Sequence, residues 1–341
     1  MVKGISIRMI DLHVHLDGSL EPSEILQLAE LSQVPLPTND VYELRNLLTV
    51  QEDCTSLSEY LEKFKLPLTV LQTDIEIERS VCFLVTKLAK QGLCYAEIRF
   101  APQLHIQKGF SQNEIVTAAV NGLKKGIQLS GMPCQLILCC MRGNQNYNEN
   151  IETIAVSKHF LHKGICAVDL AGNESAYPTN AFTDVFDYAS QLDIPIIIHA
   201  GEAAGAQSVK QALELGAVRI GHGIHAIEDL ELLRTIKSKK IILETCFTSN
   251  LQTKSIEQMK DYPIKDFMDY GVLVTVNTDN MTVSGTTLKK EYQLLKEYFF
   301  CSEEMLKQFA LNAAEGAFVS KHEKEILCNQ IYKNFHTWLL E

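Results

Sequence analysis

Four side chains in this sequence could together hold a metal ion. His13 and His15 stand one residue apart at the end of an apolar run, so in a β-strand both would project to the same side. Two neutral imidazoles favour a divalent metal, zinc above all, although an H-x-H pair alone also occurs as a surface or core pair. His199 and Asp279 follow two later apolar runs and would complete three nitrogens and one oxygen. Such a shell leaves a position for water, whose pKa zinc lowers from about 16 toward 7.

Two further residues could transfer protons beside such a site. Glu202 lies three residues after His199 and is suited to general acid or base catalysis. Its alternative role is that of a carboxylate at a helix start, where the helix dipole favours it. His222 stands between two glycines, where the backbone must approach other groups closely, and could be a second polar group aimed at the water. Its alternative role is that of an ordinary histidine in a tight turn.

The elements that must position these residues are eight short apolar runs. Most are continuous rather than alternating, which is typical of parallel strands buried on both faces. Amphipathic helical patterns separate several of them. The runs are 5–12, 95–100, 134–141, 165–170, 194–198, 218–220, 241–243 and 272–276, and the helical patterns are 113–129, 183–191, 210–215 and 227–237.

This alternation predicts an α/β fold, a (β/α)8 TIM barrel built from right-handed βαβ units. The carboxyl ends of barrel strands meet on one face, so residues from 13 to 279 would gather in one cup. Residues 18–93 break the rhythm and predict a helical insertion after strand 1, a candidate lid whose first helix Ser19 or Ser23 would cap. The length of 341 residues allows two domains. Because the chemistry is spread along the chain and no linker is present, we expect a single domain, 1–341.

The composition excludes some partners. The chain has 31 Lys+Arg against 42 Asp+Glu, a formal charge of −11, whereas nucleic acids and anionic membranes demand a basic face. No apolar run reaches the ~18 residues of a membrane span, and the start lacks the apolar region of a secretion signal. The ten cysteines show no C-x-x-C spacing and lie mostly in apolar runs, which is typical of buried thiols in a reducing compartment. We expect a cytoplasmic protein that binds neither nucleic acid nor a membrane; the oligomeric state stays open.

Other classes of catalytic site fit less well. Some barrel hydrolases hold two metals bridged by a modified lysine at the end of the fourth strand, but here Lys163 precedes that strand and the strand ends at Asp169-Leu-Ala-Gly172. One metal is therefore the better interpretation. The H-x-E and P-C-x-x-C patterns of cytidine deaminases do not occur, nor does a G-x-x-x-x-G-K-[ST] phosphate loop.

Seven segments, in order along the chain, resemble the motifs of adenosine deaminases. They are DLHVHLDGSL (11–20), YAEIRFAP (95–102), DLAGNE (169–174), HAGE (199–202), IGHG (220–223), TSNLQT (248–253) and VNTDN (276–280). The resemblance covers residues 9 to 327, essentially the whole chain. It implies a (β/α)8 barrel with one zinc ion per chain. It also implies hydrolytic removal of the 6-amino group of adenosine or 2'-deoxyadenosine, which gives the inosine nucleoside and ammonia.

The resemblance also implies a role for each matching residue. The zinc ligands are His13, His15, His199 and Asp279. Glu202 donates a proton to purine N1, His222 orients the attacking hydroxide, and Asp279 accepts a hydrogen bond from it. The residues that bind the substrate are His15, Asp17, Gly172 and Asn280, with Asp17 at the ribose 5'-hydroxyl and the Gly172 N–H at purine N3.

Three features of the resemblance bear on substrate binding. The row Leu57, Tyr60, Leu61 and Phe64 matches an apolar lid over the nucleoside, although its spacing alone describes an ordinary buried helix face. Many family members have Asp where this chain has Asn280; purine N7 only accepts hydrogen bonds, and an amide donates one directly. Phe247 stands where a proline is frequent, which affects a turn and not the chemistry.

The main hypothesis is a zinc-dependent adenosine deaminase of purine salvage whose partner is a small purine nucleoside. One alternative keeps the chemistry but acts on adenine or another 6-aminopurine nucleoside. A second alternative is a catalytically inactive relative that only binds nucleosides. All six ligands and proton-handling residues are present, which argues against the second.

Overall fold

The computed structural model describes residues 9–51 and 53–340. The first apolar run was predicted from residue 5, so its residues 5–8 lie outside the described part. Within that part, each of the eight predicted runs coincides with or overlaps one strand. The strands are β1 (Met9–His15), β2 (Leu93–Phe100), β3 (Cys134–Met141), β4 (Ile165–Ala171), β5 (Ile197–Ala200), β6 (Arg219–His222), β7 (Ile242–Thr245) and β8 (Leu273–Val276).

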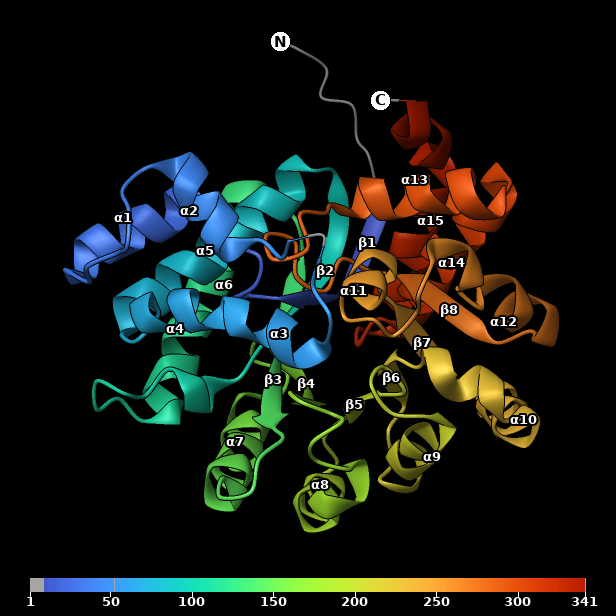
Figure 1. Cartoon of the computed structure of the whole chain (residues 1–341), viewed down its shortest axis with the longest axis horizontal. Coiled ribbons are helices and arrows are strands. Elements are labelled where there is room, and N and C mark those ends of the chain that lie inside the picture. The colour runs from blue at the N-terminus through green and yellow to red at the C-terminus, as the bar shows by residue number, and fades with distance from the viewer. Residues whose placement is uncertain (1–8, 52, 341) are drawn as a thin grey trace.

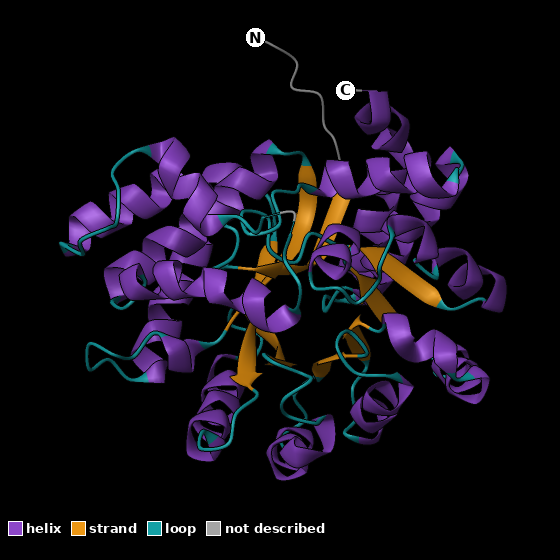
Figure 2. Ribbon diagram, viewed as in Figure 1, coloured by secondary structure: helices purple, strands orange, loops and turns teal. Residues whose placement is uncertain are grey.

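The strands form two parallel four-stranded sheets, in the orders β1-β2-β3-β4 and β5-β6-β7-β8. Single bridges join the two sheets at both seams, Val14 with Asp279 and Val168 with Ile196. Helices surround the strands, as Figure 2 shows. This arrangement is that of a (β/α)8 barrel, and the predicted fold class is confirmed.

Helices follow the strands around the outside of the barrel (Figure 1). The α-helices are α1 (Pro22–Ser32), α2 (Val41–Leu48), α3 (Leu57–Leu61), α4 (Lys65–Val70), α5 (Asp74–Lys90), α6 (Gln112–Ser130), α7 (Tyr147–Phe160), α8 (Thr183–Gln191), α9 (Ala206–Glu214), α10 (Leu230–Ser238), α11 (Phe247–Gln252), α12 (Ile264–Tyr270), α13 (Leu288–Phe299), α14 (Glu303–Gly316) and α15 (Lys321–Leu340). Short 3-10 turns are η1 (Glu62–Phe64), η2 (Pro102–Leu104), η3 (Thr179–Phe182), η4 (Ile224–Glu228) and η5 (Met259–Asp261).

The insertion between β1 and β2 is helical, as predicted, and contains α1 to α5. The expected cap of its first helix is wrong. Glu21, not Ser19 or Ser23, is the N-cap residue of α1, and its N–H donates to Glu24 Oε2 at 2.7 Å. Pro22 sets this boundary, because its fixed φ suits the first helical position and its missing N–H is not needed there.

The fifth predicted run begins at residue 194, whereas β5 begins at Ile197. Pro195 lies between these positions and has no N–H to donate to a neighbouring strand. Its carbonyl still accepts from the Val168 N–H at 3.0 Å, so the chain enters the barrel alongside β4 before the ladder of β5 begins.

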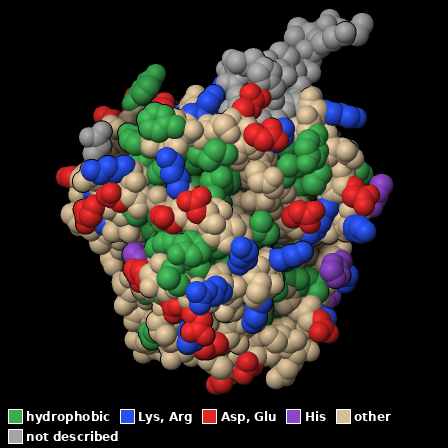
Figure 3. Space-filling view, turned by 90° about the vertical axis from the view of Figure 1, so that its right-hand side faces the viewer, with side chains coloured by type: hydrophobic (Ala, Val, Ile, Leu, Met, Phe, Trp, Pro, Cys, Tyr) green, Lys and Arg blue, Asp and Glu red, His purple; other side chains and the backbone are tan. Residues whose placement is uncertain are grey.

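The strands are buried almost throughout, which explains why the apolar runs are continuous. All ten cysteines lie in the described part as free thiols, most of them buried. Among the residues that the structure describes, none of the helices combines the length and apolar character that a membrane crossing requires. Figure 3 shows one face of the molecule, where acidic and basic side chains are interspersed with apolar patches.

Candidate active site

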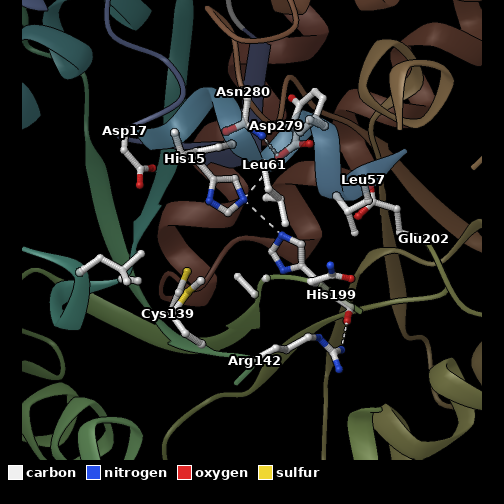
Figure 4. Close-up of a pocket in the computed structure, with 18 of the residues that line it drawn as sticks. His15, Asp17, Leu57, Leu61, Cys139, Arg142, His199, Glu202, Asp279 and Asn280 are labelled. Carbon is white, nitrogen blue, oxygen red and sulfur yellow. Dashed lines mark hydrogen bonds and ion pairs between the residues drawn. The ribbon is translucent and has the colours of Figure 1, made fainter. Parts of the chain in front are cut away.

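The four predicted metal ligands lie together at the carboxyl ends of the strands. His13 and His15 come from β1, His199 comes from β5, and Asp279 follows β8. One ligand atom from each lies within 4.8 Å of all the others. The Nε2 atom of His15 is 3.2 Å from His199 Nε2 and 3.4 Å from Asp279 Oδ1 (Figure 4). The structure thus brings together residues that are far apart in the sequence.

The donor set fits a divalent metal ion. His13 Nε2 is buried without a hydrogen-bond partner and lies 3.5 Å from Asp279 Oδ1. Burial lowers the pKa of His15 and of His199, so both imidazoles are neutral near pH 7 and offer lone pairs. Although burial opposes it, the contact with His13 holds the pKa of Asp279 below its ordinary value, so this ligand is an anion. Three nitrogens and one carboxylate oxygen are typical zinc ligands.

Buried carboxylates behind two of these histidines orient their rings. His13 Nδ1 lies 2.9 Å from Glu244 Oε2, and His199 Nδ1 lies 2.9 Å from Asp169 Oδ2. The Arg99 guanidinium donates to both carboxylates at 2.8 Å. A carboxylate at Nδ1 fixes the proton there and leaves the Nε2 lone pair free for a metal.

Glu202 lies at the same end of the barrel with 5% of its surface exposed. Its Oε1 accepts from Thr253 Oγ1 at 3.2 Å and from Asn250 Nδ2 at 3.4 Å. Burial, and then the negative charges of Asp279 and Glu174, raise the pKa of Glu202 well above its ordinary value. A carboxyl that keeps its proton near neutral pH can serve as a general acid.

A hydrogen-bonded chain fixes the protonation of His222. The Tyr262 hydroxyl donates to Asn250 Oδ1 at 3.0 Å, so the Asn250 Nδ2 group faces His222 Nδ1, also at 3.0 Å. Because Nδ1 accepts this bond, the ring proton lies on Nε2, which is 3.5 Å from Glu202 Oε2. Burial lowers the pKa of His222, which favours this neutral form.

Two of these residues have an unusual backbone conformation. His222 has φ 60° and Asp279 has φ 58°, both in the left-handed region that residues other than glycine rarely adopt. Such conformations cost about 1–3 kcal/mol each and concentrate at functional sites. The Asp279 carboxylate accepts from Ser249 Oγ at 2.5 Å and from Asn280 Nδ2 at 2.7 Å, so its position is fixed on both sides.

A cavity of about 300 Å³ opens beside the ligand cluster. Its lining includes the predicted substrate-binding residues Asp17, Gly172 and Asn280, of which Asp17 and Asn280 are labelled in Figure 4. Gly172 has φ 107°, a conformation that favours glycine. A Cβ at Gly18 would fall 2.0 Å from the Asn280 side chain, so this glycine makes room for Asn280 at the cavity wall.

The apolar wall of the cavity comes from the insertion. The row Leu57, Tyr60, Leu61 and Phe64, on α3 and η1, lines the cavity as the lid hypothesis required. The Tyr60 hydroxyl lies 2.7 Å from Ser284 Oγ, which ties α3 to the loop after β8. This part of the insertion thus rests on the loop that carries Asp279.

Sequence reasoning missed several residues that support the site. Glu244 lies inside a buried strand, where a carboxylate needs a partner, and that requirement was a usable signal. Asn250 and Thr253 belong to the TSNLQT segment but were given no role. Glu174 ends the DLAGNE segment, and Tyr262 falls in no motif at all.

Comparisons with known proteins agree with this geometry. The family model described as adenosine deaminase matches residues 9–334. An adenosine deaminase of Haemophilus ducreyi is 45% identical over 340 residues, covering 98% of this chain and 99% of the relative. An adenosine deaminase of Enterococcus faecalis is 42% identical over 323 residues, covering 94% and 95%.

Solved structures share the fold. The adenine deaminase of Arthrobacter aurescens superposes with a TM-score of 0.86 at 25% identity, covering 97% of this chain and 99% of the other. An N6-mAMP deaminase of Arabidopsis gives 0.84 at 24% identity, covering 96% and 98%. An amidohydrolase of Burkholderia ambifaria with bound Zn gives 0.88 at 20% identity, covering 98% and 92%, and this likeness shows the fold alone.

Proposed function

Because this chain belongs to the adenosine deaminase family, we propose that it hydrolyses adenosine and 2'-deoxyadenosine to the inosine nucleoside and ammonia. The observation that carries the proposal is the position of Glu202, a buried carboxyl with a raised pKa beside a complete metal-binding cluster. We propose one zinc ion per chain, held by His13, His15, His199 and Asp279. When bound, zinc lowers the pKa of water and supplies hydroxide near neutral pH.

Three residues of the chain have the other catalytic roles in this proposal. Glu202, protonated near neutral pH, donates to purine N1, which makes C6 more electrophilic. His222 presents an Nε2–H toward the reacting end of the cavity and orients the attacking oxygen. Asp279 accepts a hydrogen bond from that oxygen while it ligates the metal. Together these groups stabilise charge that develops at C6 during attack.

The cavity favours a nucleoside over a nucleotide. Arg142 is the only Lys or Arg among the described residues that line it. Its guanidinium already donates to the carbonyls of Tyr177 and His199, both at 2.6 Å, and to Thr179 Oγ1 at 3.0 Å. Burial raises the pKa of Asp17 to about 6, so this carboxyl is largely anionic at pH 7 and repels a phosphate.

The same cavity favours a sugar-bearing substrate over free adenine. Asp17 offers a polar partner for the 5'-hydroxyl, and the apolar row Leu57, Tyr60, Leu61 and Phe64 lines the same cavity. In this scheme the Gly172 N–H donates to N3 and the Asn280 amide donates to N7. His15 lies between substrate and metal, since it lines the cavity and also belongs to the ligand cluster.

We also propose that residues 1–341 form one domain, because a single site draws residues from position 13 to position 279. The free thiols suit a reducing compartment, and we place the protein in the cytoplasm.

One absorbance assay tests the substrate. We expect turnover of adenosine and 2'-deoxyadenosine, with adenine and AMP converted at least about 100-fold less efficiently, since each misses or strains a polar contact. Metal analysis of the purified protein should give one zinc per chain. Preferred turnover of adenine would establish the alternative substrate, and preferred turnover of AMP would contradict the choice of a nucleoside. Nucleoside binding without turnover, in a protein without zinc, would establish the inactive relative.

A further inference from the structure

Another buried carboxylate, that of Glu174, has so far entered only through its charge, which contributes to the raised pKa of Glu202. It follows β4, and 3% of its surface is exposed. It accepts hydrogen bonds from four consecutive backbone N–H groups: Gly201 at 2.7 Å to Oε1, and Glu202 at 2.9 Å, Ala203 at 2.7 Å and Ala204 at 3.1 Å to Oε2. Successive N–H groups that converge in this way form a binding site for an anion. Here the chain supplies the anion itself.

The loop that Glu174 contacts is the one that carries Glu202. It runs from β5 to α9, and its turn is tight: Gly201 has φ 69°, and a Cβ there would lie 2.5 Å from Val209 Cγ2. Without this acceptor, the buried N–H groups of Gly201 and Glu202 would lose their partner, which costs about 1–3 kcal/mol for each such group, and the half-buried N–H groups of Ala203 and Ala204 would lose theirs as well. Glu174 therefore determines where the backbone of Glu202 lies.

Further polar contacts hold the two elements that flank this loop, α9 and β5. Ser208 Oγ donates to Glu174 Oε1 at 2.5 Å and lies 2.8 Å from Thr179 Oγ1. The Arg142 guanidinium donates to Thr179 Oγ1 and to the His199 carbonyl, as Figure 4 shows for the latter. Arg142 thus holds the strand that leads into the loop, and Glu174 holds the N–H groups of the loop itself.

From these contacts we infer that Glu174 is a positioning residue for Glu202: its carboxylate fixes the backbone of residues 201–204 so that the Glu202 carboxyl faces the reacting end of the substrate. The inference rests on the proposed function, since it concerns the acid of that reaction. A displacement of about 1 Å in a catalytic group can cost 10²-fold in rate, so removal of this anchor is costly to catalysis.

A double-mutant cycle tests the inference. Glu174→Gln keeps the size of the side chain but replaces one acceptor oxygen with a donor that faces N–H groups. We expect kcat for adenosine to fall about 10- to 100-fold with KM changed less than about threefold, because the nucleoside contacts lie elsewhere. In a Glu202→Gln background the same change should cost less than about twofold, because the group that Glu174 positions is already absent. Zinc content should be unchanged in every variant.

A matched control separates positioning from general destabilisation. Glu76→Gln removes a comparably buried carboxylate on α5, where it accepts from Thr73 Oγ1, and should leave kcat unchanged. Should Glu174→Gln fail to fold, Ser208→Ala removes one donor to the same carboxylate and should give a smaller loss of kcat with the same dependence on Glu202.

Three results would overturn the inference. They are no loss of kcat in Glu174→Gln, an equal loss in both backgrounds, or a loss that follows zinc content. These outcomes differ from failure of the proposed function itself. In that case the wild-type protein would deaminate neither adenosine nor 2'-deoxyadenosine.

Discussion

The two sheets of this barrel contribute differently to the site. Strands β1 to β4 have seven or eight residues each, whereas β5 to β8 have four each. The first half supplies the apolar cavity wall, through the insertion after β1. The second half carries Glu202, His222 and Asp279, the residues proposed to handle protons, at or shortly after the ends of its short strands. Binding surface and chemistry are thus largely separated along the chain.

The metal-binding cluster lies where the two halves meet. Two of the four proposed ligands come from β1, and the other two come from the second half. The backbone joins there as well, since the His15 N–H donates to the Asp279 carbonyl at 2.7 Å and the Asp279 N–H donates to the His13 carbonyl at 2.8 Å. If the division is real, substitutions in the second half should lower kcat, and substitutions in the cavity wall should raise KM.

The largest effect is expected from Glu202→Gln. The amide cannot donate a proton to purine N1, so kcat for adenosine should fall about 10²- to 10⁴-fold while zinc stays bound. Steady-state kinetics and metal analysis of the same preparation measure both quantities. The raised pKa of Glu202 keeps its carboxyl protonated near neutral pH. In the wild type, activity should therefore decline at alkaline pH, where Glu202 loses this proton. Equal turnover by variant and wild type would refute the role of this residue.

A pair of tyrosine substitutions compares the two halves directly. Tyr262→Phe leaves Asn250 Oδ1 buried without its hydrogen-bond donor. The Asn250 amide can then turn over, so His222 is no longer held with its proton on Nε2, and kcat should fall about 10-fold. Tyr95→Phe removes an equally buried hydroxyl in the first half, where it donates to Glu97. It should cost a similar amount of stability in a thermal melt, about 1 kcal/mol, with kcat unchanged. Equal effects on kcat would contradict the division.

The cavity wall should respond in KM. Leu61→Ala removes an apolar contact from the lid, and a loss of about 1 kcal/mol in binding corresponds to an increase of about fivefold in KM. Turnover at saturating adenosine should stay within about twofold. Leu31→Ala, at an exposed position on α1, is the control and should change neither parameter. A fall in kcat without a rise in KM would show that Leu61 acts on the chemical step rather than on substrate binding.

The smallest effect is expected from Asn280→Asp, and it should depend on pH. An Asp donates to purine N7 only when it is protonated, whereas the amide donates at every pH. We expect a loss of about two- to threefold in kcat/KM near pH 7 that grows as the pH rises and disappears as it falls. Parallel pH profiles for the variant and the wild type would show that this contact is not made.

Much of the site could be predicted because parallel strands gather their carboxyl ends. Knowing only that eight runs alternate with helices, one expects His13, His199 and Asp279 to meet, and they do. Arg99 and Asp169 also stood at strand ends, but their partners could not be named, because pairing between distant strands depends on packing. The cap at Glu21 was missed since serine is the commoner choice and the reciprocal bond to Glu24 is a matter of local geometry.

The junction between β1 and the segment after β8 has a consequence for folding. A metal ion held there links β1, the first strand, to Asp279, which follows the last strand β8, and closes a loop that contains nearly the whole barrel. The entropic cost of closing a loop rises only with the logarithm of the loop's length, so closing this long loop costs little more free energy than closing a short one. Binding energy at this point is therefore also folding energy. Loss of the ion should release the amides of β1 and of residues 277–280 to hydrogen exchange before those of β3 and β4.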